Sequence, residues 1–134
     1  MAGKNSQGAA ALDVWWKARE LSVETYRITA ALPTHELYAL TSQLRRAALS
    51  VAANIAEGHA RRSLGDYRRH VDIARGSCAE LETLLLITTD LRYGSASDIA
   101  ELIARVQVVG RMLTNLARAL EAMPKKGVNH SPRP

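Results

Sequence analysis

The chain has 134 residues and a formal net charge of +5, a length that fits one domain able to bury a sizeable core without disulfides. Apolar residues make up 47% of the sequence and phenylalanine is absent, so we predict an aliphatic core. The single cysteine, Cys78, excludes an internal disulfide, and no Cys/His spacing is typical of a zinc site. Neither a signal-peptide core nor a membrane-length apolar run is present, so we expect a cytoplasmic protein without membrane contact.

The apolar spacing is helical from residue 12 to residue 123. We expect this range to form the folded domain, between a disordered lead at 1–11 and a disordered basic tail at 124–134. The first helix is predicted from about Leu12 to Leu32 and is ended by Pro33. Its core stripe holds Val14, Ala18, Leu21, Thr25, Ile28 and Leu32, and a neighbouring stripe holds Leu12, Trp16, Val23, Tyr26 and Ala30. Two stripes exceed what one core requires, so this helix is expected to bury surface against another subunit.

The second helix is predicted from Thr34, as its N-cap, to Ala56 or Glu57, and Gly58 is expected to end it. Its inner stripe comprises Leu37, Leu40, Leu44, Ala47, Val51 and Asn54. Many of its other positions are alanine or serine, and such small side chains allow a neighbouring helix to approach closely.

The third helix is predicted to begin at Ser63, with Asp66 three residues later as in a capping box, and to end at Gly94. Its core stripe comprises Leu64, Tyr67, Val71, Ala74, Cys78, Leu81, Leu85 and Thr88, and a second stripe comprises Ile73, Ser77, Glu80, Leu84, Ile87 and Leu91. The fourth helix is capped by Ser95 or Ser97 and its stripe runs from Ile99 to Met123. Four amphipathic helices joined by short loops predict an all-α, antiparallel up-down-up-down four-helix bundle.

The sequence carries no catalytic or metal-binding pattern that we can identify. Di-metal bundles need Glu-x-x-His pairs, which are absent, and His35 and Glu36 are adjacent and so lie on different faces. A bundle ribonuclease motif would need an arginine followed by four to six residues and then a histidine, and no histidine here meets that spacing. Cys78 lies in a core stripe, where a small buried hydrophobe is expected. We therefore expect no enzymatic activity, no cofactor and no metal.

Two polar residues interrupt the apolar stripes. Asn54 falls on the inner stripe of the second helix, and Glu80 falls on the second stripe of the third. We predict that both are buried polar groups, with Glu80 paired to Arg45 or Arg46 or accepting from Asn54. Such residues either fix the register of the helices or form a polar pocket within the bundle, and the sequence leaves both readings open.

A basic segment accounts for most of the net charge. Seven arginines against three carboxylates fall between residues 45 and 75. Arginine forms planar forks with phosphate, so we predict nucleic-acid contacts. The candidate residues are Arg45, Arg46, Arg61, Arg62, Arg68 and Arg69. The alternative is a solvated face or salt bridges between subunits. No helix-turn-helix, RRM or KH signature indicates sequence-specific recognition.

The segment from Leu37 to Leu86 resembles a known bacterial family. The most specific pieces are LTSQLRRA at 40–47, NIAEG at 54–58, DY at 66–67, GS at 76–77 and ELET at 80–83. They resemble the four helix bundle protein family, the intervening-sequence proteins of large-subunit ribosomal RNA. Two positions depart from that family's pattern: Ala52 stands where proline is frequent, and His70 where an aromatic or apolar residue is common.

The resemblance implies a bundle that assembles into a ring-like homo-oligomer, expected to be a pentamer, with a nucleic-acid role. We therefore expect a non-enzymatic oligomer that binds RNA or DNA without sequence specificity. The alternative is a scaffold protein whose arginines serve subunit or partner contacts.

Overall fold

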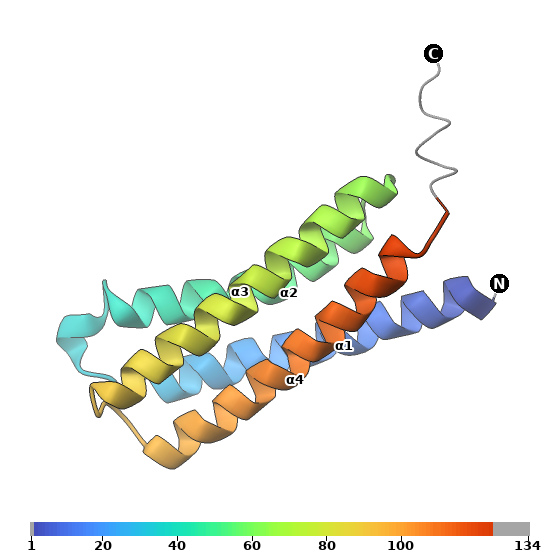
Figure 1. Ribbon diagram of the computed structural model, residues 1–134. Helices are drawn as coiled ribbons and strands as arrows, with labels where there is room; N and C mark the ends of the chain where they lie inside the picture. The colour runs from blue at the N-terminus through green and yellow to red at the C-terminus, as the bar shows by residue number, and fades with distance from the viewer. Residues whose placement is uncertain (1, 125–134) are drawn as a thin grey trace.

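Four long helices make up the computed structural model, which describes residues 2–124, with side chains from residue 8 onward. They are α1 (Ala2–Thr29), α2 (Leu40–His59), α3 (Leu64–Asp90) and α4 (Ala96–Glu121), with a short 3₁₀ helix, η1 (Thr34–Glu36), before α2. Each helix contacts the next along the chain, and α1 also contacts α4, which closes a four-sided bundle (Figure 1). Between residues 2 and 124 there is no strand. The predicted all-α antiparallel bundle is confirmed.

The core is aliphatic and follows the predicted three-and-four spacing. Leu21, Leu44, Leu81, Leu85 and Leu113 are each at most 1% exposed. Burial of this apolar surface is the main stabilising contribution, at about 25 cal/mol per Å² removed from water. These residues belong to the stripes assigned from the sequence, but the prediction that Leu37 lies on the inner stripe is wrong: it precedes α2 and is 42% exposed. None of the described helices is both long and apolar enough to cross a membrane.

The ends of α1 and α2 differ from the predictions. The predicted disordered lead at 1–11 is wrong for residues 2–11, which form the first turns of α1. The prediction that α2 starts at Thr34 is also wrong, because η1 and a turn precede Leu40. Glu36 contacts the first residue of α2: its Oε1 accepts from the Leu40 backbone N–H at 3.4 Å, and its Oε2 accepts from Tyr93 Oη at 2.9 Å. The hydrogen bond from Tyr93 to Glu36 is also the main reason that the pKa of Tyr93 is raised. Apart from Pro124, the predicted tail at 124–134 lies outside the described residues.

Serine caps begin α3 and α4, as predicted. Ser63 Oγ accepts from the Asp66 backbone N–H at 3.0 Å, and Ser95 Oγ accepts from the Asp98 backbone N–H at 3.2 Å. Helix α3 ends at Asp90 rather than at Gly94, whose φ of +69° lies in the left-handed region that glycine enters at little cost. The α2–α3 connection, the start of α1 and the end of α4 all lie at one end of the bundle (Figure 1).

Candidate nucleic-acid interface

The hairpin formed by the end of α2, residues 60–63 and the start of α3 is held together by close packing. Gly58 was predicted to end α2 but is a buried residue inside it. A Cβ at this position would stand 2.7 Å from His70 Cβ and 3.3 Å from Tyr67 Cδ1. Glycine is therefore needed because α3 crosses α2 here at short distance. His59 Nδ1 lies 3.3 Å from Tyr67 Oη, and the two rings meet edge to face.

Four predicted arginines gather on this hairpin. Arg61 is paired with Glu57 at 2.6 Å, and Arg68 lies 3.9 Å from Glu121 of α4. Arg62 and Arg69 are exposed, and within the described chain neither has a carboxylate within 4 Å. The hairpin therefore presents two arginines whose donors are not used by a neighbouring acid.

Arg45 and Arg46 lie apart from these four. About 20 Å of helix separates Arg45 from His59 at the end of α2, at 1.5 Å per residue. Arg45 is half-buried against α1: its Nε donates to Thr29 Oγ1 at 2.9 Å, and its guanidinium lies 4.6 Å from the centre of the Tyr26 ring. The structure thus brings together four of the six predicted arginines and uses Arg45 to hold α1 against α2.

A polar cluster connects α2 to α3 beside the hairpin. Asn54 is half-buried, and its Oδ1 accepts from His70 Nδ1 at 2.9 Å while its Nδ2 donates to the Ser50 carbonyl at 2.9 Å. Ser50 Oγ lies 2.8 Å from Ser77 Oγ. The polar atoms of this cluster are therefore hydrogen-bonded across the interface, which is the usual condition for placing them there.

The prediction that Glu80 is a buried polar group is wrong. Its side chain is exposed, as are Ile73, Ile87 and Leu91 of the same stripe. No ion pair within 4 Å joins it to Arg45 or Arg46 in the part of the chain that the structure describes. The partner of Asn54 is His70, which is only 5% exposed and which sequence reasoning did not assign. In the sequence, His70 comes directly before the core residue Val71. This position is the signal that could have predicted that His70 faces α2.

Cys78 is 4% exposed, as predicted for a small core residue. Burial, with a smaller contribution from the charge of Glu82, raises the pKa of its thiol from 9.0 to about 12.

We expect thiol reagents at pH 8 to label the folded protein at least 100-fold more slowly than the protein in denaturant, because the thiolate is the reactive form. The raised pKa also means that the folded state holds this proton more tightly, so this contribution to stability falls as the pH rises above about 9. Equal labelling rates in buffer and denaturant would contradict the assignment.

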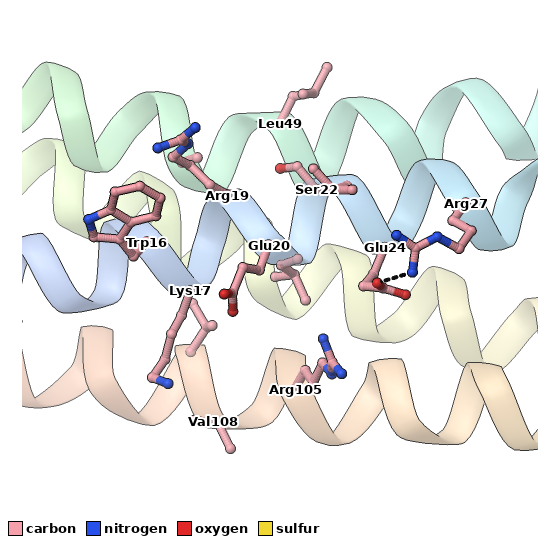
Figure 2. Close-up of a pocket in the computed structure, with 14 residues that line it drawn as sticks. Trp16, Lys17, Arg19, Glu20, Ser22, Glu24, Arg27, Leu49, Arg105 and Val108 are labelled. Carbon is pink, nitrogen blue, oxygen red and sulfur yellow. Dashed lines mark hydrogen bonds and ion pairs between the residues drawn. The ribbon is translucent and has the colours of Figure 1, made fainter.

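Among the described residues, no group of three or more His, Cys, Asp or Glu side chains is arranged to hold a metal ion. A surface hollow of about 920 Å³ follows α1 rather than the hairpin (Figure 2). Trp16 and Arg19 of α1, Leu49 of α2 and Val108 of α4 are among the residues that line it.

Comparisons with known proteins agree with this architecture. A crystal structure of a protein of unknown function, from the S23 ribosomal protein family of Bacteroides thetaiotaomicron, superposes with a TM-score of 0.74 at 19% sequence identity, covering 81% of this chain and 98% of that one. At that identity the likeness shows the fold. No curated protein matches the chain. Residues 10–115, well over half of the sequence, match one family, and the chain belongs to it: the 23S rRNA-intervening sequence protein family.

Proposed function

We propose that the protein is a non-enzymatic homo-oligomer that binds the phosphate backbone of RNA or DNA through the arginines of the α2–α3 hairpin. The observation that carries the proposal is the pair Arg62 and Arg69, exposed on one hairpin and without a carboxylate within 4 Å in the described chain. Arg62 keeps its donors available for phosphate oxygens, and Arg69 does so apart from the contact of its Nη2 with His70 Nε2 at 3.4 Å. The resemblance to the intervening-sequence family adds the expectation of a pentamer.

The positive charge of the hairpin supports contacts to the phosphate backbone of a nucleic acid rather than recognition of its bases. Between residues 57 and 75 five arginines stand against three carboxylates, a net charge of +2. A shallow hollow of about 480 Å³ at the start of α3 is lined by Gly65, Arg68, Arg69, Asp72 and Ile73, so the arginines lie at a surface that a phosphate backbone can reach. Binding of this kind releases counterions and weakens steeply as salt is added.

The test compares a hairpin variant with a charge-matched control. Arg62→Glu/Arg69→Glu is expected to weaken binding of single-stranded RNA and duplex DNA at least tenfold at low salt, in a fluorescence anisotropy titration. The slope of log K against log salt should decrease by about 0.9 for each duplex phosphate that the variant no longer neutralises. The control, Arg27→Glu/Arg111→Glu, makes the same change in net charge on α1 and α4, away from the hairpin, and is expected to change affinity less than threefold.

No binding by the wild-type protein at low salt would overturn the proposal, and so would an equal weakening in the two variants. The alternative function, a scaffold whose arginines hold subunits together, is favoured by the precedent of Arg45, which is already engaged in a contact between helices. Sedimentation of the hairpin variant separates the two functions. An intact oligomer with weakened binding supports the nucleic-acid function, and a dissociated oligomer supports the scaffold.

A further inference from the structure

Two rows of side chains repeat the three-and-four spacing of the core on the outside of the bundle. The α1 seam comprises Leu12, Trp16, Arg19, Val23, Tyr26 and Ala30, and the α3 seam comprises Ile73, Ser77, Glu80, Leu84, Ile87 and Leu91. Each seam spans roughly 27 Å at 1.5 Å per residue. This spacing is that of a coiled-coil contact, so the element that fits each seam is another helix.

Most of the large apolar members of both seams are exposed, and Leu84 of the α3 seam is half-buried against the core. In the α1 seam Leu12 is 55%, Trp16 50% and Val23 59% exposed. In the α3 seam Ile87 is 42% and Leu91 48% exposed. Isolated exposed apolar residues need no explanation, but continuous apolar rows mark interaction surfaces.

Each seam contains one charged residue, and the two charges are opposite. Arg19 is the third member of the α1 seam; its guanidinium lies 4.4 Å from the Trp16 ring centre and 4.8 Å from that of Trp15. Glu80 is the third member of the α3 seam and is exposed. Neither has an oppositely charged partner within 4 Å in the described chain. A charge set among apolar neighbours requires such a partner once a second helix covers it.

We propose that the α1 seam of one copy packs in parallel against the α3 seam of a second copy, with Arg19 of one chain paired to Glu80 of the other. Aligning the two charges also matches side-chain sizes along the seams. Trp16 falls opposite Ser77, which is recessed at 8% exposure, and Ala30 falls opposite Leu91. The register that aligns the charges therefore sets the largest member of the α1 seam over the recessed Ser77, whose Oγ lies 2.8 Å from Ser50 Oγ of α2.

The topology permits this contact. Helices α1 and α3 run in the same direction, as alternate helices of an up-down-up-down bundle, and each is flanked by α2 and α4 rather than by the other (Figure 1). The α1 hollow, with Trp16 and Arg19 beside α2, is shown in Figure 2. A contact between two different surfaces is heterologous, so each copy uses one seam toward each of two neighbours. The inference rests on the self-association in the proposed function and not on nucleic-acid binding.

Charge reversal with rescue tests the pairing, by sedimentation velocity over a concentration series. Arg19→Glu and Glu80→Arg are each expected to weaken self-association at least tenfold, because like charges then face each other in the contact. The double variant Arg19→Glu/Glu80→Arg restores opposite charges at every contact and should recover most of the assembly. Arg111→Glu, an exposed charge reversal on α4 outside both seams, should leave assembly unchanged. Far-UV circular dichroism confirms that each variant is folded.

The possible failures are distinguishable. A wild-type protein that stays monomeric over the whole series overturns both the self-association and this contact, whatever the anisotropy titrations show. A wild-type oligomer that is insensitive to both single reversals, or a double variant no better than the weaker single one, overturns the seam pairing alone. Nucleic-acid binding is measured separately on the hairpin variant.

Discussion

Replacing Gly58 with alanine is expected to lower the free energy of unfolding by about 2 kcal/mol, within the range for overpacked positions. The added Cβ would lie 2.7 Å from His70 Cβ, a separation that requires α2 and α3 to move apart. Alanine favours a helix interior over glycine by about 1 kcal/mol, so the steric cost must exceed that gain for the protein to be destabilised. Urea denaturation followed by circular dichroism measures the difference.

Gly110→Ala is the matched control. Gly110 lies inside α4, and a Cβ there would meet nothing within 4 Å outside its own helix turn. The same substitution is therefore expected to be neutral or to stabilise the protein by up to about 1 kcal/mol. If the two variants shift the unfolding midpoint equally and in the same direction, the close approach of α2 and α3 at Gly58 is not a constraint on the fold.

Replacing Asn54 with leucine is expected to destabilise the protein by about 2 kcal/mol, because a buried polar group would be left without its partner. His70 is 5% exposed, and its Nδ1 would no longer have the Asn54 oxygen to donate to. The Ser50 carbonyl would be left without this donor as well. Equilibrium unfolding in urea gives the magnitude.

Two further variants identify the cause. Asn115→Leu makes the same change at an exposed position on α4 and is expected to lie within about 0.5 kcal/mol of wild type. Asn54→Asp keeps an acceptor for His70 but removes the donor to Ser50, so it should be less destabilising than Asn54→Leu. If Asn54→Leu is as stable as wild type, the hydrogen bond to His70 is dispensable and the cluster has no role in holding α2 to α3.

The hairpin proposed to bind nucleic acid and the seams proposed to join subunits lie on different parts of the molecule. Arg62 is exposed in the connection between α2 and α3, at the end of the bundle where α4 also ends (Figure 1). The α1 seam runs along a helix that contacts α2 and α4 on its inner side. An oligomer built through the seams would repeat the hairpin once per subunit, and several weak phosphate contacts would then act together.

The sequence by itself determined which side of each helix is buried and where α3 and α4 begin. Burial of Leu44, Leu81 and Leu113 follows from a periodicity that is local to each helix. The caps at Ser63 and Ser95 are likewise local, because the hydroxyl and the N–H that it accepts from are three residues apart.

Only the tertiary structure decided how the remaining side chains are used. Glu80 is exposed and Asn54 is paired with His70, although both interrupt apolar stripes in the same way in the sequence. Gly58 lies at a helix crossing and not at a helix end. Arg45 is held by α1 while Arg62 is free of any carboxylate within 4 Å in the described chain. These outcomes depend on the distance and rotation between packed helices, and the periodicity of a single helix carries neither quantity.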